Sequence, residues 1–305
     1  MNSNRIMTTR YSNNGINKIS DVEIFKGRVH VKNSKKEIYH IRFDHCPGNG
    51  AFRIMRFFLK NVVHTIDKPF IMISTGEDIT IPTQVDSRWK TKEHRSLIKE
   101  FYDSIVTHPL LIHFYIENRD ATHPKTSSLP LGLNPREFQG NNMNAIGKFM
   151  NNIPLVQGRP LKTICIHRSK PGDRAKIDSI KHNWKSLLIC GNNKYKHDSW
   201  YKLLQTYPFI ICAHGGGIDP SPKVWEALCV GCIPIIKHSS LDDVYSQFPV
   251  VFVDSFNKST ITAEKLQKWM EEYSKYFDLP ELKKEWSHKL YIGYWKNEIM
   301  NRLQN

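Results

Sequence analysis

The chain has 305 residues, of which 40% are hydrophobic and 24% are charged, a composition typical of a globular protein with two modest domains or one large one. Its formal net charge of +15 predicts an anionic partner: a phosphorylated substrate, a nucleic acid or an anionic membrane surface. No run of residues approaches the ~18 apolar positions of a membrane span, and the polar N-terminus lacks the apolar core of a secretory signal.

The first half of the chain alternates short apolar runs with helical periodicity, which predicts α/β structure with mainly parallel sheets. Apolar residues recur at helical spacing from Phe52 to Ile66 and predict one helix. Strands are expected at Glu37–Phe43, Pro69–Ser74, Leu110–Ile116 and Ser128–Gly132, with a shorter helix at Leu97–Ile105.

The second half repeats this alternation after a segment rich in Asn and Gly, Asn141–Pro160, which we expect to be an interdomain linker. We therefore predict a first domain over residues 1–150, a second over 151–262, and C-terminal helices over 263–305 that pack back on the first domain. Strands are expected at Lys162–Arg168, Leu187–Cys190, Phe209–Ala213, Cys232–Lys237 and Pro249–Val253, and helices at 171–184, 200–204 and 262–276.

The six cysteines favour a structural role in a reducing compartment. Four of them, Cys165, Cys190, Cys212 and Cys232, lie in or beside apolar runs, where free thiols pack as small hydrophobic groups. Cys229 and Cys232 form a C-x-x-C, but there is no second pair and no suitably spaced histidine, so zinc is not expected. We expect the protein in the cytoplasm.

The segment Pro208–Ile236 is the most informative part of the chain, because it predicts a strand, a glycine loop, a helix and a second strand. Ser221 is expected to cap the helix, and Pro222 to occupy its first position. A glycine loop that leads into a helix N-terminus is a natural anion site, since unpaired N–H groups and the helix dipole point at it.

Two charged residues of this helix suit a nucleotide-sugar ligand. Lys223 lies in the first turn and can meet a phosphate. Glu226 lies three residues further on, and its carboxylate can accept hydrogen bonds from sugar or ribose hydroxyls. The loop, the lysine and the carboxylate together predict a nucleotide-sugar site.

The same segment resembles the exostosin-like glycosyltransferases over about thirty residues. Two positions depart from the family pattern: Lys223 replaces the usual arginine and loses its bidentate fork, and His214 stands where arginine or glutamate is common. A weaker resemblance extends upstream through Pro69–Pro82 and His123–Leu133. The matching residues are Phe209, Gly215, Gly217, Asp219, Lys223, Trp225, Glu226, Ala227, Leu228, Gly231, Ile233 and Pro234.

The resemblance implies a GT-B fold, in which two Rossmann-like domains with mainly parallel sheets face a central cleft. It also implies sugar transfer from a UDP-linked donor, such as a xylose, GlcNAc or glucuronate donor, to a glycan hydroxyl, with inversion at the anomeric carbon. Many family members are anchored in the Golgi by an N-terminal helix, and we expect this chain to work without one. Its Lys-, Asn- and Ile-rich composition suggests a viral or microbial source.

Ligands of open α/β sheets bind outside the carboxyl ends of the strands, which selects the donor-side loops. Asp219 can cap backbone N–H groups or touch the sugar, Trp225 can stack on uracil or pack in the core, and Arg168 can clamp a diphosphate or lie at the surface. Glu226 has the alternative of an exposed helix position. The predicted donor-binding residues are Arg168, His214, Gly215, Gly216, Gly217, Ile218, Asp219, Lys223, Trp225 and Glu226.

On the acceptor side, a glycine-containing loop joins the first predicted strand to its helix, and Gly48, Gly50 and Arg53 are the expected contacts. An inverting transferase needs a base within hydrogen-bond reach of the acceptor hydroxyl. Asp78 is the preferred catalytic residue and His45 the second choice, and Asp44 and Glu77 are further candidates. The alternative for each is a structural role in its loop.

We expect no metal and no cofactor other than the nucleotide-sugar co-substrate, because the chain contains no Asp-x-Asp. Helix N-termini, Lys223 and Arg168 would then offset the charge of the leaving group. One alternative is a basic nucleic-acid-binding protein on an α/β scaffold. The distribution of charge argues against it, because the basic residues are spread along the chain with no block of five or more. A transferase-like protein that binds glycans without turnover is the other.

Overall fold

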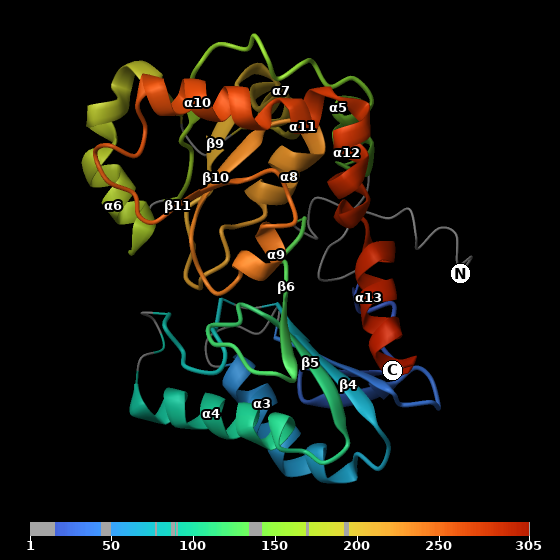
Figure 1. The fold of residues 1–305 in the computed structure, drawn as a ribbon. Coiled ribbons are helices and arrows are strands. Elements are labelled where there is room, and N and C mark those ends of the chain that lie inside the picture. The colour runs from blue at the N-terminus through green and yellow to red at the C-terminus, as the bar shows by residue number, and fades with distance from the viewer. Residues whose placement is uncertain are drawn as a thin grey trace.

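The computed structural model describes residues 16–43, 50–76, 78–86, 89, 91–133, 142–168, 171–191 and 195–304 (Figure 1). Within these residues the chain forms a six-stranded sheet from its first half and a five-stranded sheet from its second half. Figure 1 shows the two sheets one above the other, each with its own layer of helices. No helix of the described residues is long and apolar enough to cross a membrane.

The first sheet has the strand order β2-β1-β3-β4-β5-β6 and is parallel throughout, except for an antiparallel hairpin of β1 and β2 at one edge. The hairpin was not expected from the sequence, because all four residues of β2 are exposed and show no buried stripe. The strands are β1 (Val22–Phe25), β2 (Arg28–Val31), β3 (Ile38–Arg42), β4 (Phe70–Thr75), β5 (Leu111–Glu117) and β6 (Thr126–Leu129).

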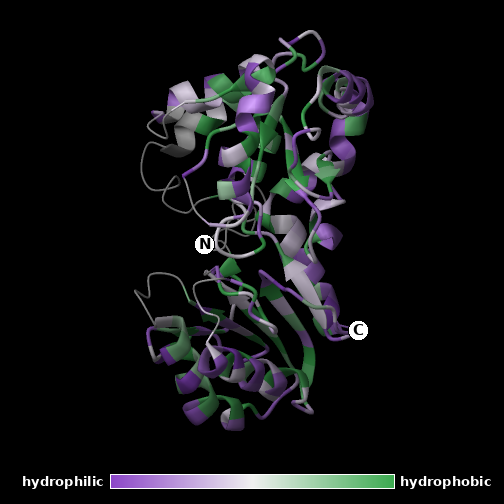
Figure 2. Cartoon of the chain, turned by 90° about the vertical axis from the view of Figure 1, so that its left-hand side faces the viewer, coloured by the Kyte–Doolittle hydropathy of each residue, from purple (hydrophilic) through white to green (hydrophobic). Residues whose placement is uncertain are grey.

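Successive residues of the central strands face two different cores. On β4, Phe70 and Met72 pack with the helices α3 (Gly50–Asn61) and α4 (Lys92–Val106), whereas Ile71 and Ile73 belong to the core that continues into the second half. Strands buried on both faces have near-continuous apolar sequences, which is why they were predicted at the right places. In Figure 2 the strands of the first sheet are largely coloured as hydrophobic, and the helices packed on them are largely hydrophilic on their outer sides.

The second sheet is parallel throughout, in the order β11-β10-β9-β7-β8. Its strands are β7 (Thr163–Ile164), β8 (Leu188–Ile189), β9 (Phe209–Ile211), β10 (Ile233–Lys237) and β11 (Val251–Val253). Its helices are α5 (Asn142–Asn151), α6 (Asp173–Ile180), α7 (His197–Thr206), α8 (Lys223–Val230) and α9 (Asp242–Tyr245).

Helix α5 lies where the sequence predicted a linker. It contacts α7 and α8, so this segment is part of the helical layer on the second sheet. The side chain of Gln205 on α7 donates hydrogen bonds to the carbonyl oxygens of Phe149, at 2.5 Å, and Asn152, at 3.1 Å. A segment rich in Asn and Gly forms a helix here because its neighbours stabilise it, which outweighs its weak helix propensity.

Four α-helices follow the second sheet: α10 (Ala263–Tyr273), α11 (Lys275–Asp278), α12 (Pro280–Ser287) and α13 (Ile292–Gln304). The last of them runs down to the first sheet, where it contacts β4 and β5 (Figure 1). The hydroxyl of Tyr115 on β5 lies 3.4 Å from the carbonyl oxygen of Glu298, to which it donates a hydrogen bond. Helix α13 therefore covers part of one face of the first sheet.

His40 provides a test of how tightly the first sheet is packed. It is fully buried on β3, with Nε2 at 2.8 Å from Thr75 Oγ1, and burial lowers its pKa to about 3. The unfolded chain takes up this proton near pH 6.5, so the contribution of His40 to stability is complete above pH 6.5 and is lost as the pH falls toward 3.

We expect H40Q to lose less unfolding free energy than the wild type between pH 6.5 and 4.5, by up to about 1.4 kcal/mol per pH unit. Urea unfolding at a series of pH values measures this difference. H64Q, which removes an exposed histidine of the same half, is the control. Equal slopes for the two variants would contradict a buried neutral His40.

Candidate functional site

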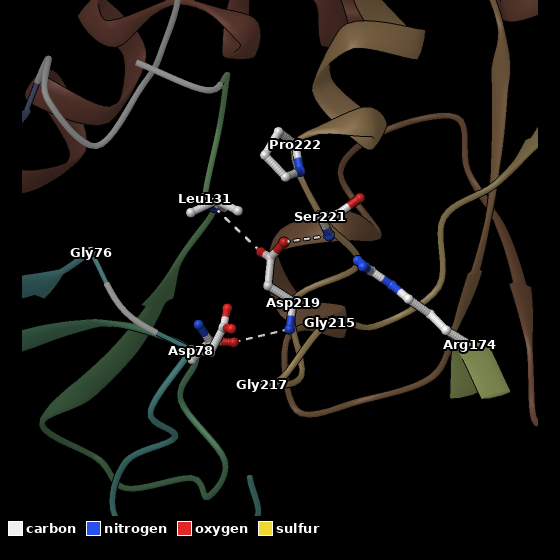
Figure 3. Close-up of a pocket in the computed structure, with 10 residues that line it drawn as sticks. Gly76, Asp78, Leu131, Arg174, Gly215, Gly217, Asp219, Ser221 and Pro222 are labelled. Atoms are coloured by element: carbon white, nitrogen blue, oxygen red, sulfur yellow. Dashed lines mark hydrogen bonds between the residues drawn. The ribbon is translucent and has the colours of Figure 1, made fainter. Parts of the chain in front are cut away.

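A cavity of about 240 Å³ lies between the two halves (Figure 3). Every part of its lining comes from a segment that follows the carboxyl end of a strand: β4, β5 and β6 in the first sheet, β7 and β9 in the second. Ligand sites of parallel sheets lie at these ends. The lining residues are Gly76, Asp78, Asn118, Leu131, Arg174, Gly215, Gly217, Asp219, Ser221 and Pro222.

The glycine loop after β9 approaches the first sheet so closely that one position admits no side chain. A Cβ on Gly217 would lie 2.6 Å from Asn118 Oδ1 and 2.6 Å from the carbonyl oxygen of Asp78. At this distance Asn118 Oδ1 accepts hydrogen bonds from the backbone N–H groups of Ile218, at 3.1 Å, and Asp219, at 2.9 Å. Asn118 joins the two halves at the cavity wall.

Asp219 is buried and holds the loop from the other side. Its Oδ1 accepts from the N–H of Ser221 at 2.7 Å, and its Oδ2 accepts from the hydroxyl of Tyr245 at 2.7 Å and from the N–H of Leu131 at 3.4 Å (Figure 3). Burial raises the pKa of this carboxyl to about 6. Of the two roles considered for Asp219, capping of backbone N–H groups is therefore present in the structure.

Helix α8 begins one residue later than the sequence predicted. Pro222 takes the capping position, Lys223 is the first helical residue, and Ser221 makes no side-chain cap. Ser221 instead has φ 84°, in the left-handed region that residues other than glycine rarely occupy. Its Oγ is buried at the cavity wall and has no hydrogen-bond partner in the described part of the chain.

The three predicted ligand residues of α8 lie outside this cavity lining. Lys223 Nζ donates to the carbonyl oxygen of Ile166, and burial lowers its pKa. Glu226 is buried, and its Oε2 accepts from Trp200 Nε1 at 2.7 Å. Trp225 is buried in the core, where its ring lies edge-on to that of Phe248 with centroids 5.1 Å apart, so the structure shows the core-packing alternative.

Among the described residues, the cation that lines the cavity is Arg174, which was not predicted from the sequence as a site residue. It lies in the first turn of α6, is only 8% exposed, and extends toward the glycine loop (Figure 3). Burial lowers its pKa, and its Nε has no hydrogen-bond partner among the described residues. The predicted Arg168 is exposed and absent from the lining. The sequence did carry a signal for Arg174, because an arginine lies in the first turn of the helix expected after a predicted strand.

His214 is a buried neutral residue and not a cation of the site. Its Nδ1 lies 3.4 Å from Asp173 Oδ2, which also pairs with Lys237 Nζ at 2.7 Å. Burial lowers the pKa of His214 to about 4. Gly215, in the loop beside it, marks a point that two side chains approach. A Cβ on Gly215 would lie 3.5 Å from Arg174 and 4.0 Å from an oxygen of Asp78.

On the first half, Asp78 lines the cavity as expected. Gly50 opens α3 and is buried, and Arg53 is exposed on α3 outside the lining. The candidates His45, Gly48, Asp44 and Glu77 lie outside the described residues. Besides Arg174, three residues of the lining were not predicted as site residues: Gly76, Asn118 and Leu131. Ser221 and Pro222 were predicted only as a helix start.

A second connection between the halves lies beyond Asn118. The Arg119 guanidinium donates to Ser128 Oγ at 2.9 Å within the first half and pairs with Asp243 Oδ2 of α9 at 2.8 Å. Ser240 Oγ donates to the carbonyl oxygen of Arg119. Asn118 thus holds the glycine loop against the end of β5, and Arg119 holds Ser240 and α9 of the second half against the same part of the first.

No group of three or more His, Cys, Asp or Glu side chains that could hold a metal occurs in the part of the chain that the structure describes. This observation does not test metal-independent transfer, which stays a prediction.

No family model matches the chain, and no curated protein matches it in sequence. The apo structure of OtsA superposes on 88% of this chain and 73% of its own, with a TM-score of 0.50 at 10% identity. The fold is GT-B. A sucrose-phosphate synthase from Thermosynechococcus elongatus covers 88% of this chain and 74% of its own, with a TM-score of 0.47 at 10% identity. A trehalose-6-phosphate synthase covers 88% of this chain and 72% of its own, with a TM-score of 0.42 at 10% identity.

The contact at Gly217 gives a stability prediction with a control in the same loop. We expect G217A to lower the unfolding free energy by about 1–3 kcal/mol, because its Cβ must displace Asn118 or the Asp78 backbone. G215A adds the same methyl group where the nearest atoms are at ordinary contact distance. Denaturant unfolding of both variants measures the difference, and equal stabilities would contradict the close approach of the loop.

Proposed function

We propose that this protein is a glycosyltransferase that transfers a sugar from a nucleoside diphosphate donor, UDP in the first place, to a hydroxyl of a glycan. One observation carries the proposal: a buried arginine, a glycine loop and a helix N-terminus meet in one cavity at the carboxyl ends of both sheets. The GT-B fold and the exostosin-like motif of Pro208–Ile236 support it.

The diphosphate is assigned to the second-half side of the cavity. Arg174 offers charged donors, and Ser221 offers a hydroxyl just before the first turn of α8. Lys223 stands behind this turn, where its Nζ donates to the carbonyl oxygen of Ile166, and it does not line the cavity. Buried cations without a full set of partners are stabilised by a bound anion, so the electrostatics of the site favour a phosphate group.

The size of the cavity limits what it receives. Small-molecule sites usually measure about 300–1,000 Å³, and this one is smaller, at about 240 Å³. We therefore assign to it the diphosphate and the transferred sugar, with the nucleoside outside.

Asp78 is assigned as the base on the acceptor side. It lies on the first half of the lining, and Gly215 brings Arg174 and Asp78 to the same point of the cavity. In an inverting displacement the acceptor hydroxyl loses its proton to Asp78, its oxygen bonds to the anomeric carbon, and the diphosphate leaves toward Arg174 and α8. No metal is needed in this scheme, because protein cations meet the leaving charge.

Donor binding is tested by calorimetric titration with UDP, GDP and several UDP-sugars, with and without EDTA. We expect UDP to bind in both conditions, and R174Q to weaken the binding about tenfold or more, since it removes the charge at the diphosphate. K176Q removes a charge from an exposed position of the same helix and serves as the control. UDP affinity unchanged by R174Q would refute the assigned site.

The role of Asp78 is tested by turnover, measured as UDP release from the UDP-sugar that binds best. We expect D78N to lower kcat by about 10²–10⁴ and to change the affinity for UDP much less. D67N, which neutralises an exposed carboxylate of the same half, is the matched control. NMR of the product gives the anomeric configuration, and a retained configuration would contradict direct displacement.

A further inference from the structure

Two cysteines directly follow adjacent parallel strands of the second sheet, at the same level. The register pairs Thr163 with Leu188 and Ile164 with Ile189, so the next pair along β7 and β8 is Cys165 and Cys190. The pairing continues into this position, because the N–H of Cys165 donates to the carbonyl oxygen of Ile189 at 2.9 Å.

This register brings the two thiols together. Residues at the same level of neighbouring strands point to the same face, and neighbouring strands lie about 4.7–4.9 Å apart. A disulfide needs Cα atoms about 4.4–6.8 Å apart. Neither thiol is in a disulfide, and each shifts the pKa of the other.

The two thiols differ in the way that thiol exchange requires. Cys190 is exposed, whereas Cys165 is buried beneath it. The hydrogen bond from Cys165 lowers the pKa of Cys190 to about 6, helped by the charge of Lys181, and raises the pKa of Cys165. Lys181 Nζ lies 2.8 Å from Asp178 Oδ1, and the negative charge of Asp178 opposes the effect of Lys181 on the pKa of Cys190. One thiol can attack, and the other can resolve.

We propose that Cys165 and Cys190 form a redox-active thiol pair that a low-molecular-weight disulfide, such as oxidised glutathione, converts into an intramolecular disulfide. The Cys190 thiolate attacks one sulfur of the small disulfide and releases one thiol, leaving a mixed disulfide. The Cys165 thiol then gives up its proton, attacks the Cys190 sulfur and releases the second thiol. Two protein thiols are oxidised, and one small disulfide is reduced to two thiols.

The remaining cysteines of the described residues provide internal controls. Cys212, Cys229 and Cys232 are buried, as expected for thiols that pack as hydrophobic groups. Burial raises the pKa of Cys232 to about 12, and the pKa of Cys212 is raised as well. Both stay protonated and out of reach of a reagent while the protein is folded.

The test equilibrates the folded full-length chain in glutathione buffers of increasing oxidised fraction, blocks free thiols and maps the peptides by mass spectrometry. We expect a linked Cys165–Cys190 peptide that dithiothreitol removes, with Cys212 and Cys232 still reduced. In reduced protein at pH 7, iodoacetamide should modify Cys190 at least about tenfold faster than Cys165. No linked peptide at any buffer composition would refute the proposal.

Single variants separate the two roles. We expect C165S to accumulate a stable glutathione adduct on Cys190, because nothing resolves it, and C190S to form no adduct on the buried Cys165. Circular dichroism checks that each variant is folded, and C165A replaces C165S if the hydroxyl is not tolerated. An adduct that persists on Cys190 in the wild type would show that Cys165 does not resolve it and would overturn the pair.

Discussion

The arrangement of the site depends on one contact across the boundary between the halves. Asn118 accepts hydrogen bonds there from two backbone N–H groups of the glycine loop. The loop reaches Asn118 only because position 217 has no side chain. This close approach sets the distance from β5 to α8, and it therefore determines the width of the cavity between Asp78 and Arg174. Asp219 and the Arg119–Asp243 pair hold the same geometry from either side.

The central strands of both sheets could be predicted from the sequence, because burial on both faces leaves a continuous apolar signal. The β1–β2 hairpin could not, since β2 is exposed at all four residues and its pairing depends on β1 and not on a buried face. Helix α5 was concealed for a related reason. Its sequence is weak in helix formers, and it forms against α7 and α8, which a local pattern does not contain.

The loops of the site were predictable, whereas the directions of their side chains were not. The rule for carboxyl ends of parallel strands selected the segments after β4 and β9. Residues of a first helical turn, however, can face a ligand or the core, and Lys223 and Glu226 face Ile166 and Trp200. Arg174 faces the cavity because α6 starts at Asp173, after Gly172 with φ 84°. Asn118 takes its position with φ 57°, which spacing alone does not reveal.

Helix α13 has a consequence for how the protein is made. It covers β4 and β5, which are encoded near the beginning of the chain, yet it ends at Gln304. During synthesis the apolar face that carries Ile71, Ile73 and Tyr115 therefore stays uncovered until α13 has left the ribosome. The first half cannot complete its fold as a unit ahead of the second, and a chain released before α13 is made has an open, aggregation-prone sheet.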